Sequence, residues 1–435
     1  MIKIVDHAYE PEAVLQKNLT TVLRALRSGI GVKIVHPVGF IHGRLKNIPG
    51  VIYEESAILP RRREKVILPS FIMEHYAEAH FVHTGMPSCN ASMFLHKGRM
   101  ILLARETNYT FRDHPERKRV GGWPVVHGWP EKQRCYTNEI LYDFDLKTNT
   151  ATKIGYLSFV PEEERHRLNY IGYEDMRIMA WGENPVASFT IVDNDHNFTM
   201  GCAEVREDLT LGEVKKVPTA NAIEKNWLPI VGKPHQYIYS FEPYQIIDMS
   251  TGEIRNAGKG AGMKLRGSSP VIMHRGRRIC MAHINNWPAC KSYLHMFVEF
   301  GADMSIQHIS CPFSFFGAAI EFNTCIFSAG DDLEVLFSIH DQLLYRVTIS
   351  ADLLDKIFAG TLTDASPISN LYERLYADAV SNGNIKTAVG VATFSVKKDI
   401  RKEAAVLVKG LADVDDKNKA RIIAQLTRYP WFLRR

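Results

Sequence analysis

One short segment of the chain combines two carboxylates with a guanidinium. Residues 172–177 read Gly-Tyr-Glu-Asp-Met-Arg, so Glu174 and Asp175 follow a glycine and Arg177 precedes an apolar run. Side chains alternate along a strand, and we therefore expect Asp175 and Arg177 on one face with Glu174 on the other. A carboxylate near a guanidinium stays ionised, whereas one in an apolar pocket can act as an acid. Asp175 is the candidate catalytic acid, and the alternative is a salt bridge within a turn.

A second segment could bind a sugar. Residues 224–229 read Glu-Lys-Asn-Trp-Leu-Pro. The amine of Lys225 could contact a phosphate, the amide of Asn226 a sugar hydroxyl, and the ring of Trp227 the apolar face of a sugar. The alternative is that Trp227 is a core residue of a β-protein.

A third segment places a cation beside a glycine. Residues 265–270 read Leu-Arg-Gly-Ser-Ser-Pro, and His283 follows downstream. Gly267 beside Arg266 would allow the backbone to approach an anionic or hydroxylated ligand closely. The alternative is a capped turn that leads into a strand.

A fourth segment, residues 338–341, reads Ser-Ile-His-Asp at the end of an apolar run. His340 and Asp341 could bind a sugar or shuttle protons there, or they could be structural. The sequence contains no phosphate-binding loop, dinucleotide fingerprint, zinc-protease motif or hydrolase elbow. Its histidines and cysteines lack the spacing of metal ligands, so the sequence predicts neither a metal site nor a cofactor.

The elements that must position these residues are mostly strands. Residues 86–350 contain short runs rich in β-branched and aromatic residues, separated by Gly, Asn, Asp and Pro, which is typical of an all-β sandwich, barrel or propeller. The turns at 96–98 and 274–276 predict hairpins. Helical periodicity is confined to the flanks, over residues 11–28, 368–380, 397–409 and 416–426.

This pattern predicts three regions. We expect an N-terminal extension over residues 1–85, with a helix and short strands including 31–36, a catalytic β-domain over 86–350, and a helical extension over 351–435. The basic turn at 61–63 could touch phosphate or be a solvated loop. The basic, aromatic tail at 428–435 could lie on an anionic membrane surface, but packing against the β-domain or a second subunit is the favoured interpretation.

Charge and cysteine content indicate which ligands and which cellular compartment to expect. The net charge of +5 suits an anionic substrate such as a sugar nucleotide or phosphate and falls short of a nucleic-acid-binding signature. The seven cysteines are scattered and include no Cys-x-x-Cys pair, as is usual in a reducing compartment. The first residues lack the apolar stretch of a signal peptide. We therefore expect a cytoplasmic protein that binds no nucleic acid.

Taken in order, the four segments resemble motifs of glycoside hydrolase family 130, the mannoside phosphorylases and β-mannosidases, and of the related β-1,2-mannosyltransferases. The likeness covers about residues 86–350. Two positions depart from the family: Met176 replaces a proline, and residues 198–201 lack the arginine expected in a phosphorylase. The matching residues are 89–92 with Arg105, 174–177, 225–229, 266–270 and 338–341.

The resemblance implies a five-bladed β-propeller and an inverting mechanism. In such a mechanism Asp175 would protonate the departing oxygen, partly through a sugar hydroxyl. Lys225, with Arg177 or Arg266, would hold phosphate or a diphosphate. The implied substrate-binding set is Asn90, Arg105, Glu174, Arg177, Lys225, Asn226, Trp227, Arg266, His283, His340 and Asp341.

Three functions remain open at this point. The lead hypothesis is transfer of a glycosyl unit, with mannose favoured, from a sugar nucleotide or sugar phosphate to a glycan acceptor. The second is a β-mannoside phosphorylase or hydrolase, and the third is a propeller that only binds glycans or proteins. The large terminal extensions would suit a transferase or a homo-oligomer. All catalytic versions require Asp175, Lys225 and Arg266 to surround one pocket.

Overall fold

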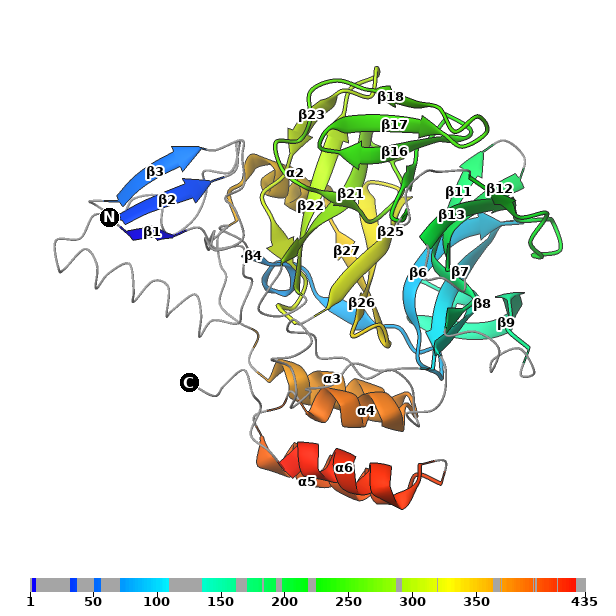
Figure 1. The fold of residues 1–435 in the computed structure, drawn as a ribbon, viewed down its shortest axis with the longest axis vertical. Coiled ribbons are helices and arrows are strands. Elements are labelled where there is room, and N and C mark those ends of the chain that lie inside the picture. The colour runs from blue at the N-terminus through cyan, green and yellow to red at the C-terminus, as the bar shows by residue number, and fades with distance from the viewer. Residues whose placement is uncertain are drawn as a thin grey trace.

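The computed structural model describes residues 2–4, 32–36, 51–55 and, with internal gaps such as 109–134, residues 71–427. The helix predicted over 11–28, the basic turn at 61–63 and the tail at 428–435 lie outside the described residues. At the N-terminus, β1 (Ile2–Ile4), β2 (Val32–His36) and β3 (Val51–Glu55) form a parallel three-stranded sheet, which stands apart in Figure 1. Strand β2 confirms the strand predicted at 31–36.

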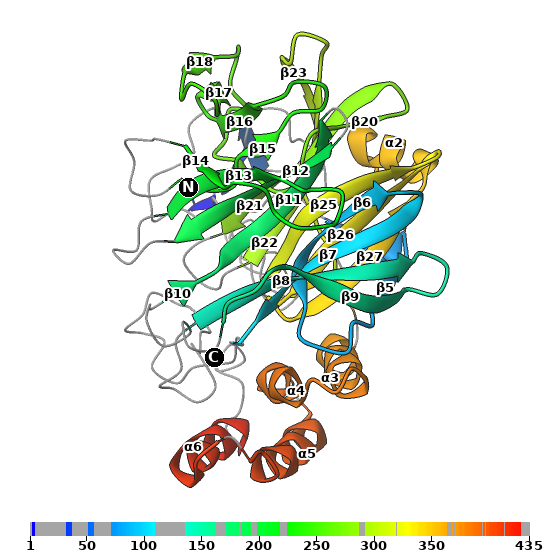
Figure 2. The same ribbon diagram turned by 90° about the vertical axis from the view of Figure 1, so that its right-hand side faces the viewer.

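Strands between residues 71 and 349 form a β-propeller, one of the all-β folds that the strand pattern left open and the one that the resemblance implied (Figures 1 and 2). Five sheets build it in the described part of the chain. The first sheet contains β6 (Cys89–His96), β7 (Arg99–Thr107), β8 (Cys135–Asp145), β9 (Thr150–Ser158) and β10 (Tyr170–Ile171). The second contains β11 (Tyr173–Trp181), β12 (Asn184–Val192), β13 (Phe198–Glu204) and β14 (Lys215–Lys216).

The remaining three sheets complete the ring. The third sheet contains β15 (Leu228–Pro229), β16 (Gln236–Phe241), β17 (Tyr244–Asp248) and β18 (Ile254–Asn256). The fourth contains β4 (Phe71–Ile72), β19 (Arg266–Gly267), β20 (Ile272–His274), β21 (Arg277–Asn286), β22 (Ser292–Phe300), β23 (Ile306–Ile309) and β24 (Phe313–Ser314). The fifth contains β5 (Ala79–Phe81), β25 (Glu321–Ala329), β26 (Asp332–Ile339) and β27 (Leu343–Ile349).

The propeller begins earlier in the chain than the sequence indicated. Strand β4 pairs with β24, and β5 pairs with β27, so residues 71–81 belong to sheets whose other strands lie at the far end of the propeller. The boundary expected at residue 85 is therefore wrong. Two and three residues carry too little periodicity to be recognised as strands, and their partners are remote in sequence.

Hydrophobic clusters fill the spaces between successive sheets and hold the ring together. Their members come from the first and second, second and third, third and fourth, fourth and fifth, and fifth and first sheets. Burial of apolar side chains on both faces of each sheet is the main stabilising term of such a fold. One pair from each cluster, in that order, is Leu141 with Phe189, Met200 with Ile247, Ile246 with Met296, Phe297 with Val335, and Leu336 with Leu102.

The predicted hairpin turns at 96–98 and 274–276 are confirmed. Lys97 and Gly98 have φ of 49° and 76°, and Arg275 and Gly276 have φ of 48° and 75°. Two successive residues with positive φ make the turn whose twist matches that of the strands it joins.

Helices follow the last strand, and α3 to α6 lie in two layers beside the propeller (Figures 1 and 2). The helices predicted over 368–380, 397–409 and 416–426 are confirmed, whereas α2 and α4 were not predicted. Among the described residues, no helix is long and apolar enough to span a membrane. Within the part of the chain that the structure describes, the helices after the last strand are α2 (Ala351–Ala359), α3 (Leu371–Ser381), α4 (Ile385–Ala392), α5 (Lys398–Lys409) and α6 (Asp416–Thr427), and the short 3-10 helix η1 (Met73–His75) follows β4.

Candidate active site

Asp175 lies on β11, the edge strand of the second sheet that contacts β6 and β25. The pairing of β11 with β12 shifts between Glu174 and Arg177, and Asp175 has φ of 54° at this bulge. Gly172 allows the strand to begin here, because a Cβ on it would lie 2.3 Å from the Thr137 carbonyl oxygen. Left-handed backbone at a non-glycine residue is disfavoured and concentrates at functional sites.

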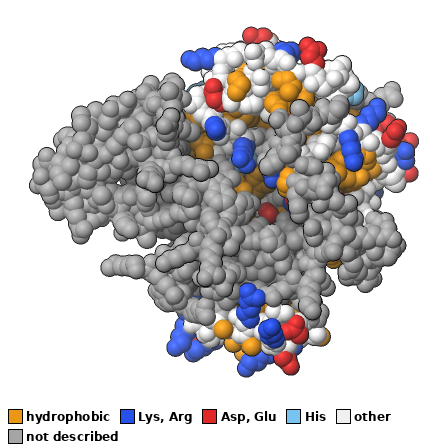
Figure 3. Space-filling view, viewed as in Figure 1, with side chains coloured by type: hydrophobic (Ala, Val, Ile, Leu, Met, Phe, Trp, Pro, Cys, Tyr) orange, Lys and Arg blue, Asp and Glu red, His pale blue; other side chains and the backbone are white. Residues whose placement is uncertain are grey.

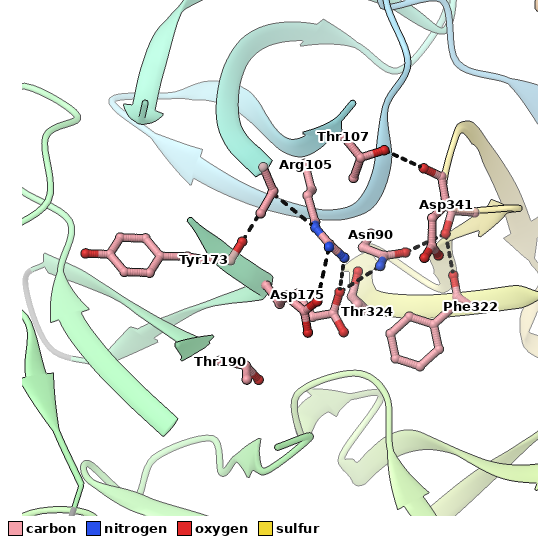
Figure 4. Close-up of polar contacts among 12 residues, drawn as sticks. Asn90, Arg105, Thr107, Tyr173, Asp175, Thr190, Phe322, Thr324 and Asp341 are labelled. Atoms are coloured by element: carbon pink, nitrogen blue, oxygen red, sulfur yellow. Dashed lines mark hydrogen bonds and ion pairs between the residues drawn. The ribbon is translucent and has the colours of Figure 1, made fainter. Parts of the chain in front are cut away.

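Two donors from the first sheet hold the Asp175 carboxylate (Figure 4). Asn90 Nδ2 donates to Asp175 Oδ1 at 2.7 Å, and Arg105 Nη1 donates to the same oxygen at 3.0 Å. Arg105 Nη2 also donates to Glu174 Oε1 at 3.3 Å. The expectation that Glu174 points away from Asp175 is therefore wrong, because the bulge interrupts the alternation and lets both carboxylates reach one guanidinium.

Further hydrogen bonds hold the side chains of Asn90 and Arg105 in place. Asn90 has φ of 45° at a bulge in β6, and Ser338 Oγ donates to its side-chain oxygen. Arg105 Nε donates to Thr137 Oγ1 at 3.1 Å. Both side chains are almost fully buried, so their orientation toward Asp175 is set by the fold.

The charges around Asp175 keep it ionised. Burial alone would raise the pKa of its carboxyl, but the positive charges of Arg105, Arg177 and Lys225 and the hydrogen bond from Asn90 outweigh burial. The pKa of Asp175 is therefore held below its usual range. A carboxylate in this state is ionised at neutral pH and can accept hydrogen bonds.

Arg177 has a structural position beneath the site. Its side chain is 0% exposed, and its three nitrogens donate to protein oxygens: Nη1 to the Asp175 carbonyl at 2.8 Å, Nε to the Ser268 carbonyl at 2.6 Å, and Nη2 to Asn226 Oδ1 at 3.2 Å. Burial lowers the pKa of Arg177 to about 10, with the charge of Asp175 opposing the shift. The predicted contact of Arg177 with phosphate is therefore wrong.

In the segment at 224–229, Lys225 and Asn226 lie near Asp175, whereas Trp227 belongs to the hydrophobic core. The amine of Lys225 lies 4.8 Å from the centroid of the Phe198 ring, and its charge acts on Asp175. Asn226 adopts φ of 64° and accepts from Arg177. Trp227 is 1% exposed and donates to Glu224 Oε2 at 3.2 Å. Its ring lies in the cluster between the second and third sheets, so the prediction that it stacks on a sugar is wrong.

Gly267 permits a close approach between two protein segments. A Cβ on Gly267 would lie 2.3 Å from the Asn226 carbonyl oxygen and 2.4 Å from Leu228 Cδ2. The glycine therefore lets β19 pack against the 224–229 segment, and the expected approach of a ligand to this backbone is not what requires it. Arg266, its neighbour, is exposed.

Two predicted histidines are buried. His283 Nδ1 and Ser268 Oγ form a hydrogen bond of 2.8 Å, and the His283 ring packs against Tyr293 and Phe322. His340 is fully buried, 6.4 Å from the ring of Tyr372 in α3. Neither ring meets solvent, so the prediction of direct substrate contact by these histidines is wrong in this structure.

The buried side chain of Tyr293 lies near four of the predicted charged site residues. Burial raises the pKa of its hydroxyl, and the charges of Asp341, Asp175, Arg266 and Glu174 all act on it. Residues from four separate stretches of sequence therefore lie near one another. In Figure 4, Asp341 lies beyond Asn90 as seen from Asp175.

Cations and apolar side chains share the described surface of the face seen in Figure 3, with an acidic side chain visible deep between them. Sequence reasoning missed residues that support this region, including Thr137 and Glu139. Glu139 is buried opposite Arg105 in the pairing of β7 with β8, and burial raises the pKa of its carboxyl well above the usual value. Only the register of that pairing could have revealed it. Within the described residues, no group of three or more His, Cys, Asp or Glu could hold a metal ion.

No protein-family model and no curated protein matches this chain. Among solved structures, a β-1,2-mannobiose phosphorylase from Listeria innocua, in complex with β-1,2-mannobiose, is 11% identical, with a TM-score of 0.43 over 63% of this chain and 94% of that one. MPT-4, a mannose phosphorylase from Leishmania mexicana in complex with phosphate ion, is 13% identical, with a TM-score of 0.41 over 64% and 90%. MPT-1, a GDP-Man-dependent mannosyltransferase from Leishmania mexicana, is 11% identical, with a TM-score of 0.41 over 67% and 94%.

Proposed function

We propose that this chain is a carbohydrate-active enzyme that transfers a glycosyl unit with inversion from a sugar nucleotide or sugar phosphate to a glycan acceptor. Mannose is the proposed sugar, because residues 174–177, 225–229 and 266–270 resemble the motifs of mannoside-active enzymes. We further propose that each of the five sheets is one blade. The observation that carries the function is an ionised Asp175, held by Asn90 and Arg105 where strands from different sheets meet.

The geometry of Asp175 suits a general base. The contacts from Asn90 and Arg105 both use Oδ1, and we assign Oδ2 to the hydroxyl of the acceptor. As that hydroxyl oxygen forms a bond to the anomeric carbon, the bond from this carbon to the donor phosphate breaks on the opposite face, and the proton passes to Asp175. A lowered pKa favours this role over that of a proton donor, so we propose it in place of the acid role that the family resemblance implied.

Cations near the carboxylate would stabilise the departing phosphate. Lys225 is close enough for its charge to act on Asp175, and Arg266 stands exposed near the same centre. Positive side chains aimed at a leaving group lower the barrier because charge develops there in the transition state. Asn226 and Asp341 are assigned to sugar hydroxyls, since both side chains are partly exposed beside this centre.

The test is turnover with two donors. The purified protein is incubated with GDP-mannose, and separately with mannose 1-phosphate, in the presence of a mannose oligosaccharide, and the new linkage is assigned by NMR. We expect a product whose anomeric configuration is opposite to that of the donor. Asp175→Asn should reduce turnover by about 10²–10⁴-fold, because the base is lost. Asp248→Asn, which alters a partly exposed carboxylate in a hairpin, is the control.

Other outcomes separate the alternatives. Full activity in Asp175→Asn would refute the assignment of the base. Release of mannose 1-phosphate from a β-mannoside and phosphate, without transfer from GDP-mannose, would identify a phosphorylase. Glycan binding without turnover of any donor or β-mannoside would identify a binding propeller.

A further inference from the structure

A buried chain of hydrogen bonds joins the helical layer to the turn that carries Asp341. Thr387 of α4 donates its hydroxyl to Gln342 Oε1 at 2.5 Å, and the Gln342 amide donates to Thr107 Oγ1. Thr107 Oγ1 in turn donates to the backbone oxygen of Asp341 at 3.2 Å, a contact drawn in Figure 4. Thr387, Gln342 and Thr107 are all buried. Each donor points toward the turn, so the chain runs in one direction and its members reinforce one another.

The turn at the end of this chain has a backbone that needs support. His340 and Asp341 both have positive φ, at 56° and 52°, between the end of β26 and the start of β27. Non-glycine residues in this region are disfavoured and persist only where their surroundings hold them. The surroundings here are the contact from Thr107, the bond from Gln342 N to the Ile339 carbonyl at 3.1 Å, and the bond from His340 N to the Ile320 carbonyl at 2.9 Å.

The helices from which the chain starts are firmly docked on the propeller. Tyr345 of β27 donates its hydroxyl to Asp378 of α3 at 2.5 Å, and Arg374 of α3 pairs with Glu74 at 2.7 Å. Asn382, which follows α3, accepts from Gly85 N at 2.9 Å. Residues 74 and 85 precede β6, the strand that carries Asn90, so α3 and the residue after it are anchored both to β27 and to the segment that leads into β6.

We propose that Thr387 is a positioning residue of the active site. Through Gln342 and Thr107 it holds the His340-Asp341 turn in the conformation that presents Asp341 to the sugar, which makes α4 a functional part of the site. This inference rests on the proposed function, because Asp341 is assigned a sugar contact there. Loss of the Thr387 hydroxyl would leave Gln342 Oε1 without this donor in a buried position and loosen the turn.

Three variants test the proposal in the full-length protein. Thr387→Val removes the hydroxyl with little change of shape, and Thr387→Ser keeps it. Tyr345→Phe removes a different buried hydroxyl that docks the same helix pair. Hydrogen exchange of residues 338–343, followed by mass spectrometry without ligand, reports the turn. KM and kcat with GDP-mannose or mannose 1-phosphate report the site.

We expect Thr387→Val to speed exchange at 338–343 and to raise KM, each by about tenfold, with a smaller effect on kcat. Thr387→Ser should restore both values, and Tyr345→Phe should change neither, although it lowers the melting temperature. Unchanged exchange in Thr387→Val would overturn the proposal, as would faster exchange with an unchanged KM. If the wild type turns over neither donor, the proposed function fails, and the exchange comparison still decides whether Thr387 holds the turn.

Discussion

At the scale of single residues, Arg105 determines the charge state of Asp175. Its guanidinium is the nearest positive charge to the carboxylate, and it opposes the effect of burial, which would raise the pKa of Asp175. Because the folded-state pKa is lowered, Asp175 remains ionised as the pH falls, until the pH passes this lowered value. The stability contributed by the ionised carboxylate is likewise present above its unfolded pKa and is lost as the pH falls through the folded one.

Arg105→Gln should therefore move the acid limb of the pH–activity profile to higher pH, because the base becomes protonated sooner. The profile of kcat/KM measures this directly. Arg99→Gln is the matched control, since Arg99 lies on the same strand and pairs with Asp143 in an exposed ion pair. An acid limb at the same pH in wild type and Arg105→Gln would show that another group sets the charge of Asp175.

At the scale of elements, the site depends on how closely β19 approaches the 224–229 segment. Gly267→Ala would place a Cβ 2.3 Å from the Asn226 carbonyl oxygen, and this backbone atom cannot rotate away. We expect a loss of about 1–3 kcal/mol in the free energy of unfolding and weaker binding of the sugar donor, because Lys225 and Asn226 are displaced. Urea unfolding and KM measure the two effects.

Gly155→Ala is the control for this prediction. Gly155 lies in β9, and no atom lies within 4 Å of the position that its Cβ would take. This substitution should leave both quantities close to their wild-type values. Equal stability and equal KM in Gly155→Ala and Gly267→Ala would contradict the requirement for close packing at β19.

At the scale of the whole molecule, β5 joins the beginning of the propeller to its end. His80 of β5 is paired with Arg346 of β27, and its side chain is partly exposed. His80→Pro removes the backbone N–H and should lower the urea midpoint of the entire propeller in a single transition, by the equivalent of about 1 kcal/mol or more. His80→Ala, which keeps the N–H, should have little effect. A separate early transition in His80→Pro would show that the closure is local.

Much of the fold and part of the site could be predicted from the amino-acid sequence and the family likeness. The strand-rich region, the hairpin turns and the grouping of Asn90, Arg105, Glu174 and Asp175 follow from residue types, spacing and the family likeness. The strands and turns depend on backbone preferences that neighbouring residues express on their own. The grouping of the four side chains is long-range, and only the family likeness indicated it. The helices over 371–381, 398–409 and 416–427 were recognisable for the same reason.

The tertiary structure decided which polar residues face the site and which are buried. Arg177, Trp227, His283 and His340 carry the same side chains that a binding site would use, but neighbouring sheets and α3 cover them. The bulge at Asp175 reversed the expected direction of Glu174, and the partners of β4 and β5 came from the far end of the propeller. Burial and strand pairing depend on segments remote in sequence, and local spacing carries no information about which of them come together.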